Sequence, residues 1–272
     1  MSLTTLLQRP EVKAKFKEEF IKPRFKYNKE LLAEPLTNNY SVIGVAFDYL
    51  ARFHIEKVNS HHNVKSRQWI AETYVERSCL LPWKEDAYNM IIEEVKYAKE
   101  EFMVEGIVDE FLIKPLIKMS RIDMIHRSAQ NDIDVFAEVD SKDIEDIQNL
   151  YNVFKQQDWV AKDVCYLNPV FGEASLMVGG ADADLIFNDV LIDFKTIKKA
   201  GMTRTSFDQL MGYYLLNEIG GITEKGKIQT INSVAIYSSR YGEIMKIDIE
   251  DIFDTNRLPE LKSWMKEVSK KK

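Results

Sequence analysis

The sequence predicts an α/β fold in which a short mixed sheet is flanked by helices and preceded by a large helical region. The chain of 272 residues has only 11 glycines and 7 prolines, and because these residues interrupt helices, their scarcity favours long helices over a β-sandwich or barrel. A hydrophobic fraction of 45% and a charged fraction of 29% are typical of a globular protein. After residue 163, helical periodicity gives way to short β-favouring segments.

Residues 1–162 are predicted to form the helical region. Between residues 40 and 58 the apolar residues follow one helical stripe, which predicts a helix over about residues 41–58, the first helix of the core. Further helices are expected at residues 68–79, 86–105 and 144–156, the last of them capped by Ser141 or Asp143. The chain has no repeat or low-complexity linker. A helical insertion therefore describes it better than two independent domains.

Residues 163–272 are predicted to form the α/β core. Strands are expected at residues 175–178, 182–187, 190–195, 233–237 and 243–247. Between the third and fourth strands lies a helix that Thr205 could cap and that Gly220-Gly221 ends. A C-terminal helix starts at Pro259.

A two-residue hairpin turn is predicted at Asn188-Asp189, because Asn and Asp tolerate positive φ. This turn places Asp184 opposite Asp193 and Asp182 opposite Lys195. One face of the hairpin then carries only apolar residues and is expected to be buried. The other face carries the charged ones, with Ile186 and Leu191 beside the turn.

Carboxylates that face each other across a strand pair repel, since their Cβ atoms lie only ~5 Å apart. A divalent cation, Mg²⁺ or Mn²⁺, would compensate Asp184 and Asp193, because such ions are held by one or two carboxylates, waters and phosphate oxygens. The alternative interpretation is an exposed strand face on which Asp182 and Lys195 form a surface ion pair worth ~0–1 kcal/mol.

The segment resembles the PD-(D/E)XK nuclease superfamily, in which an acid on one strand precedes an acid-x-lysine triplet on the next. Asp184 and residues 193–195 match those places. The following helix carries Gln209 and Tyr213, which resemble the glutamine-x-x-x-tyrosine element of the RecB-type branch. The likeness covers about a quarter of the chain. It implies a restriction-endonuclease-like core and a metal-dependent DNA nuclease.

The resemblance implies a role for each matching residue. Asp184 and Asp193, with the Phe194 carbonyl, would bind the metal ion, which lowers the pKa of a bound water. Lys195 would orient that water and offset charge that accumulates in the transition state. Asp184, Asp193 and Lys195 are therefore the expected catalytic residues.

A third metal ligand is expected on the first core helix. RecB-type nucleases tend to place a glycine there and a histidine four residues later. In this chain Gly44 is followed by Asp48 at that spacing, so the resemblance assigns Asp48 to the metal with an acid in place of histidine. The rival acids are Glu56, Glu72 and Glu173.

Nucleic-acid contacts are expected from five residues. Gln209 and Tyr213 lie four apart on one helix face, where they would contact a nucleotide or support the lysine. Lys198, Lys199 and Arg204, between strand and helix, are the expected phosphate contacts.

The charge distribution is compatible with this partner although the net charge is −6. Residues 132–193 contain fourteen acids and three bases, whereas residues 195–207 contain four bases and no acid. No apolar run approaches the ~18 residues of a membrane span, and no secretory signal is recognisable, so a cytoplasmic protein is expected. The alternatives to a nuclease are a nucleic-acid-binding or scaffolding protein of the same fold, and an unrelated α/β binding protein.

Overall fold

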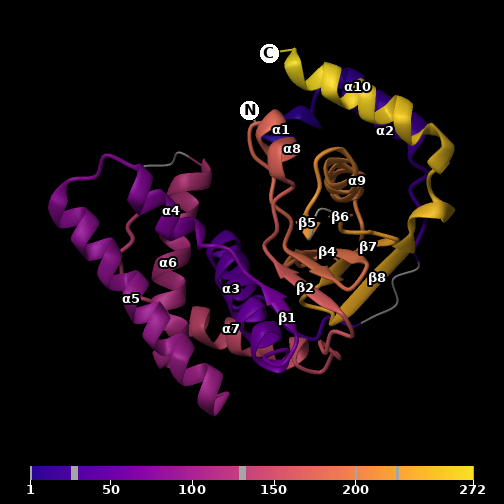
Figure 1. The fold of residues 1–272 in the computed structure, drawn as a ribbon. Helices are drawn as coiled ribbons and strands as arrows, with labels where there is room; N and C mark the ends of the chain where they lie inside the picture. The colour runs from indigo at the N-terminus through magenta and orange to yellow at the C-terminus, as the bar shows by residue number, and fades with distance from the viewer. Residues whose placement is uncertain (1, 26–29, 129–132, 200, 225–226, 272) are drawn as a thin grey trace.

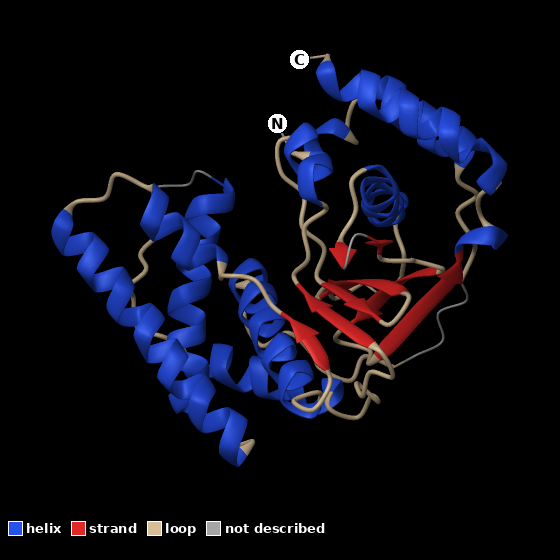
Figure 2. Cartoon of the chain, viewed as in Figure 1, coloured by secondary structure: helices blue, strands red, loops and turns tan. Residues whose placement is uncertain are grey.

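A six-stranded mixed sheet with helices on both faces forms the centre of the molecule (Figure 2). The computed structural model describes residues 2–25, 30–128, 133–199, 201–224 and 227–271. Within them the sheet order is β1-β2-β3-β4-β7-β8. The strands are β1 (Asn63–Lys65), β2 (Val164–Leu167), β3 (Leu185–Phe187), β4 (Val190–Lys195), β7 (Ser233–Ser238) and β8 (Glu243–Asp248). β1 is parallel to β2 and β4 to β7, while the other neighbours are antiparallel. The predicted α/β class with a mixed sheet is confirmed.

Helices occupy most of the remaining described chain. They are α1 (Leu3–Leu6), α2 (Pro10–Glu19), α3 (Tyr40–Val58), α4 (Ile70–Arg77), α5 (Pro82–Glu105), α6 (Glu110–Ser128), α7 (Ser141–Phe154), α8 (Gly172–Met177), α9 (Arg204–Ile219) and α10 (Leu258–Lys270). Two short 3-10 helices span Ile249–Asp251 and Thr255–Arg257, and a separate two-stranded ribbon joins β5 (Thr223–Glu224) to β6 (Lys227–Ile228).

The predicted helices are present, with shifted ends. The first core helix is confirmed as α3. α5 starts at Pro82, earlier than predicted, because proline suits the first helical turn. The N-cap of α7 is Asp140 rather than the predicted Ser141 or Asp143, because the Asp140 side chain accepts a hydrogen bond from the backbone N–H of Lys142.

Other local predictions are wrong as well. The strand expected at residues 182–187 begins only at Leu185, as β3. Residues 175–178 are largely helical, in α8, where the Ser175 hydroxyl donates to Ala181 O at 2.7 Å and accepts from Phe171 N at 2.9 Å. The N-cap of α9 is Thr203 rather than Thr205, because the Thr203 hydroxyl accepts from the N–H of Ser206 at 3.1 Å.

Both faces of the sheet are buried, so the expectation of a single apolar face is corrected. Leu185 and Ile192 pack under α3 and α7, while Ile186 and Leu191 pack on the opposite face under α9. The alternation follows from the two-residue period of a strand. Asp193 and Lys195 lie two and four residues after Leu191 on β4, so their side chains are on the same face as Leu191 and point toward α9.

The N-terminal helices belong to the sheet side of the molecule. Leu3 on α1 and Phe16 on α2 pack in the same cluster as α9 and α10, and α2 lies beside α10 in Figure 1. α4, α5 and α6, called here the helical lobe, project from the other side of α3.

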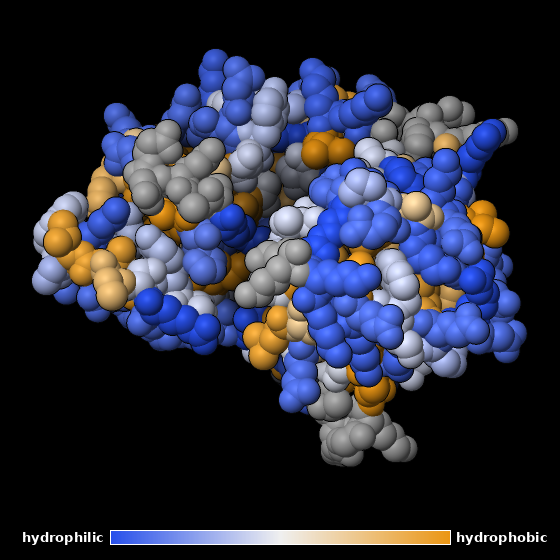
Figure 3. Space-filling view, turned by 90° about the horizontal axis from the view of Figure 1, so that it is seen from above, coloured by the Kyte–Doolittle hydropathy of each residue, from blue (hydrophilic) through white to orange (hydrophobic). Residues whose placement is uncertain are grey.

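The face in Figure 3 is mostly hydrophilic, with hydrophobic residues in small separate patches. No helix in the described ranges is long and apolar enough to cross a bilayer.

Candidate active site

The predicted hairpin brings its acids together at one end of β4. Asn188 has a φ of +57°, as the tight turn requires, and Phe187 pairs with Val190. The ladder between β3 and β4 ends one residue after Asp184. Beyond the ladder, the Asp184 side chain serves as the hydrogen-bond acceptor for β4 in place of a backbone carbonyl. Its Oδ2 accepts a hydrogen bond from the backbone N–H of Phe194 at 2.6 Å. Asp184 is therefore held against β4 beside Asp193.

Lys195 lies between Asp193 and helix α9. Its Nζ is 2.6 Å from Asp193 Oδ2 and donates to Gln209 Oε1 at 3.1 Å. Gln209 Nε2 in turn donates to the Tyr213 hydroxyl at 2.8 Å, and the Tyr213 ring stacks on Phe171. Of the two roles predicted for Gln209 and Tyr213, this geometry favours support of the lysine, since Gln209 bonds to it and Tyr213 bonds to Gln209.

Asp182 is not opposite Lys195, so that part of the predicted register is wrong. Strand pairing between β3 and β4 stops at Leu185, and Asp182 instead forms an isolated bridge with Val170. Its carboxylate is 3.6 Å from the Arg127 guanidinium. Lys195 therefore pairs with Asp193 on its own strand.

Asp48 and Asp184 line one cavity of about 380 Å³ between α3 and the end of β4. The other residues that line it are Tyr40, Ser41, Gly44, Val45, Arg127, Phe194, Thr196 and Ile197. Asp48 Oδ2 binds Arg52 at 2.5 Å, whereas its Oδ1 is buried without a hydrogen-bond partner. Asp48 thus has one buried, unsatisfied oxygen and shares its cavity with one of the hairpin acids, Asp184.

The rival acids lie elsewhere. Glu56 and Glu72 line a different cavity, where they pair with Lys99 at 2.7 Å and Lys96 at 3.1 Å. Glu173 is exposed in the first turn of α8. Only Asp48 among the four acids shares a cavity with Asp184 in the described chain.

Carboxylates outnumber cations around this cavity. Electrostatic interactions link five carboxylates to three cations: Asp48, Asp123, Asp182, Asp184 and Asp193 with Arg52, Arg127 and Lys195. When all are ionised, two negative charges are uncompensated. Burial raises the pKa of Asp184 well above its usual value, and Asp193 and Asp48 raise it further. Burial opposes the charge on Lys195, but Asp193 and Asp184 outweigh it and raise the pKa of that ammonium.

Sequence reasoning missed three of these groups. Arg127 and Asp123 come from α6, and Arg52 comes from α3. Burial raises the pKa of Asp123 to about 7, and the Tyr49 hydroxyl donates to its two oxygens at 3.1 and 3.0 Å. An acid four residues before an arginine recurs on both helices, and this helical spacing was the available signal.

The predicted phosphate contacts divide into two kinds. Lys198 and Lys199 are exposed in the loop after β4, with Lys198 Nζ 3.4 Å from Glu34. Arg204 is engaged within the fold, since it donates to Phe20 O at 3.2 Å and pairs with Asp208 at 2.9 Å. The two lysines can therefore meet a ligand without losing internal contacts of the core, whereas Arg204 cannot.

The donor set fits a hard divalent cation bound through few protein ligands. Among the described residues, no three acidic, histidine or cysteine side chains converge closely enough to enclose a metal ion. Magnesium needs only one or two carboxylates together with water. The unsatisfied Oδ1 of Asp48 and the excess of negative charge are features that such an ion would relieve.

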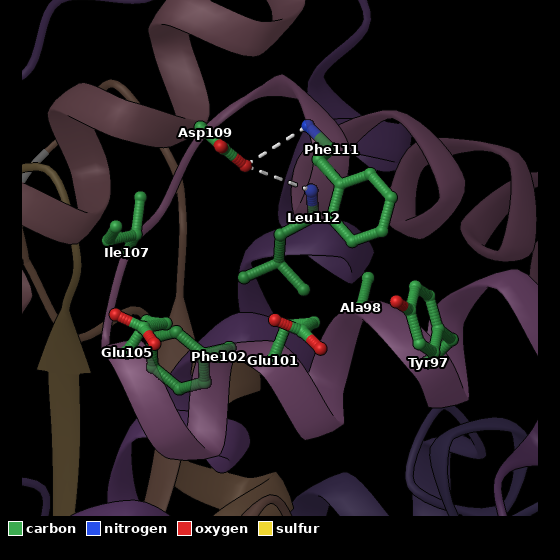
Figure 4. A pocket seen from close by; sticks show the side chains of 9 residues that line it. All are labelled: Tyr97, Ala98, Glu101, Phe102, Glu105, Ile107, Asp109, Phe111 and Leu112. Carbon is green, nitrogen blue, oxygen red and sulfur yellow. Dashed lines mark hydrogen bonds between the residues drawn. The ribbon is translucent and has the colours of Figure 1, made fainter.

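A second cavity, of about 260 Å³, lies where α5 meets α6 (Figure 4). Apolar side chains such as Phe102 and Leu112 line it together with Glu101 and Glu105. Asp109 is occupied in capping α6, because its Oδ1 accepts from Phe111 N at 3.1 Å and Leu112 N at 3.3 Å. No lysine or arginine lines it among the described residues. The cavity at Asp184 is the one lined by two of the predicted metal ligands, Asp48 and Asp184; Asp193 and Lys195 lie beside Asp184 but do not line it.

The site thus combines Asp184, Asp193 and Lys195 from the hairpin with Asp48 from α3 and Arg127 from α6. In comparisons with known proteins, the chain matches no family model, no curated protein and no solved structure.

Proposed function

We propose that this protein is a divalent-metal-dependent nuclease with a restriction-endonuclease-like core, and that it hydrolyses phosphodiester bonds in DNA. The observation that carries the proposal is the hairpin, which holds Asp184 and Asp193 beside Lys195 while Asp184 shares a cavity with Asp48. An acid, a second acid and a lysine at one strand end are the groups that this chemistry uses.

Asp184 and Asp193, together with Asp48, would hold Mg²⁺ or Mn²⁺. When bound, the ion supplies a Lewis acid that polarises the phosphate and lowers the pKa of a coordinated water. The positive charge of the ion would offset the excess of carboxylates over cations in this network. The Asp184 and Asp48 carboxyls, whose pKa values are raised, must release any bound protons before the ion enters.

Lys195 would orient the attacking water and offset the negative charge that develops on the phosphate. Its ammonium stays protonated because its pKa is raised, so it acts as a fixed charge rather than as a base. Asp193 and Gln209 hold that ammonium in place. A positioned donor of this kind is worth about 3 kcal/mol of transition-state stabilisation.

Cleavage of DNA with Mg²⁺ or Mn²⁺ tests the proposal. Wild-type protein is expected to cut single- or double-stranded DNA, EDTA to stop the reaction, and Lys195→Ala to lower the rate by about 10²–10³-fold. Lys246→Ala, an exposed lysine on β8, is the matched control and is expected to cut like wild type. Absence of metal-dependent cleavage by the wild-type protein would contradict the proposal.

A second candidate function is a catalytically weak nucleic-acid-binding or scaffolding protein that keeps the same fold. The observation that favours it is the lack of three convergent ligands among the described residues. Retention of DNA without cleavage in the same assay would support this candidate.

A further inference from the structure

Arg127 places a cation from the helical lobe at the candidate active site. It lies in the last turn of α6 and lines the cavity together with Asp48 and Asp184. Nearly half of its side chain, 46%, is exposed. A solvent-accessible guanidinium thus faces the same space as two of the proposed metal ligands.

The contacts of Arg127 are looser than those of the structural arginines. Its carboxylate partner Asp182 is 3.6 Å away, longer than the ~2.7–2.9 Å of a strong charge-assisted hydrogen bond. Arg240, by contrast, is fully buried and binds Asp146 through two hydrogen bonds of 2.7 and 3.1 Å. Arg52 is 9% exposed and committed to Asp48. Arg127 is therefore the arginine in this network that can exchange its partner.

We propose that Arg127 binds a phosphate of the nucleic-acid substrate at this cavity, so that the helical lobe supplies part of the substrate site. The inference rests on the proposed nuclease function and deepens it. Guanidinium is suited to the role because its planar donors match two phosphate oxygens. A cation bound by Asp184 and Asp48 would weaken the attraction of these acids for Arg127 and leave its donors to the phosphate.

DNA binding with Ca²⁺ in place of Mg²⁺ tests this role apart from cleavage. With a fluorescein-labelled oligonucleotide, Arg127→Ala is expected to bind about 10-fold more weakly than wild type. The slope of log K against log salt should fall by about 0.7–0.9, the contribution of one phosphate contact. Arg127→Lys should recover part of the affinity. Lys114→Ala, an exposed cation on the same helix that pairs with Glu110, is the control and should match wild type.

Asp182→Asn separates substrate binding from a merely structural contact. If Arg127 only fastens α6 to the core through Asp182, this variant will weaken DNA binding as Arg127→Ala does, and the inference is overturned. If Arg127 binds phosphate, Asp182→Asn will bind DNA as well as or better than wild type. Mn²⁺ affinity, measured by titration, should be unchanged or higher in Arg127→Ala, because a positive charge near the ligands is removed.

Two further outcomes are distinguishable. Wild-type cleavage together with an unaltered affinity and salt slope in Arg127→Ala would overturn this inference and leave the proposed function intact. Wild-type protein that neither binds nor cuts DNA would overturn both.

Discussion

Burial, and after it repulsion from Asp193 and Asp48, disfavours the charged form of the Asp184 carboxyl group. Its pKa is raised in the folded protein, so the fold binds this proton more tightly than the unfolded chain does. Stability is therefore lost as pH rises above the unfolded value, near 3.8. A neutral amide at this position removes this loss of stability and can still accept the hydrogen bond from the backbone N–H of Phe194.

Asp184→Asn is accordingly expected to raise the Tm in EDTA at neutral pH, by about 2–4 °C for each kcal/mol that is no longer lost to burial and repulsion of the charge. The difference should disappear below about pH 4, where the wild-type carboxyl is protonated in both states. Thermal melts across a pH series measure this. A lower Tm than wild type at neutral pH would mean that the carboxylate stabilises the metal-free fold.

Metal addition should stabilise wild type more than Asp184→Asn. Mn²⁺ at saturating concentration is expected to raise the Tm of wild type, because the ion binds only the folded chain. The Tm of Asp184→Asn is expected to rise only slightly. The wild-type shift should shrink as pH falls, since protons compete for Asp184 and Asp48, whose pKa values are raised. An equal shift in both proteins would exclude Asp184 from the ligands.

At the residue scale, the sequence contained enough to identify the hairpin acids and Lys195 but not their surroundings. The two-residue period of a strand links Asp193 to Lys195, and one turn dipeptide sets Asp184 against β4. Arg127 reaches the site only because α6 packs against α3, which is a tertiary contact that no local pattern encodes.

At the scale of the element, helix α9 positions Gln209 against the lysine and depends on its first turn. Thr203 and Thr205 are both exposed, and only the Thr203 hydroxyl caps the helix. Thr203→Ala is expected to lower the stability by about 1 kcal/mol. Thr205→Ala, the matched control, should leave it unchanged or slightly higher, because alanine favours a helix interior. Urea unfolding of both variants measures the difference, and a larger loss in Thr205→Ala would refute the cap.

Elements with strong periodicity were predictable, and those defined by their neighbours were not. α3 has a long apolar stripe, so its limits followed from the sequence. The residues of α8 have strand-like composition, but hydrogen bonds of Ser175 to Phe171 and Ala181 close a helical turn there. β1 has only three residues and exists because β2 pairs with it.

At the scale of the whole molecule, the sheet is stabilised by segments on both sides of it in sequence. Ile192 packs beneath α3 and α7, while Leu191 shares a cluster with Leu3 and Phe16 from the N-terminal helices. Both clusters draw on residues before position 163. The α/β core that the sequence delimited therefore lacks the surfaces that cover its strands.

A fragment of residues 163–272 is consequently expected to show no cooperative thermal transition, whereas the full chain should show one. Circular dichroism melts and amide dispersion in NMR spectra measure this. In the full chain, Phe16→Ala should lower the stability by about 3–5 kcal/mol, since the side chain is fully buried against the sheet side. A fragment that melts cooperatively would establish it as an autonomous domain.

The position of β4 in the sheet has a consequence during synthesis of the chain. β4 is completed by its parallel neighbour β7, which follows α9 in the sequence. During translation Asp48 leaves the ribosome early and Asp193 much later. The strand β7, which flanks Asp193 on its second side, leaves the ribosome last of the three. Translation products that stop before β7 contain every acid of the site and lack the scaffold that assembles them.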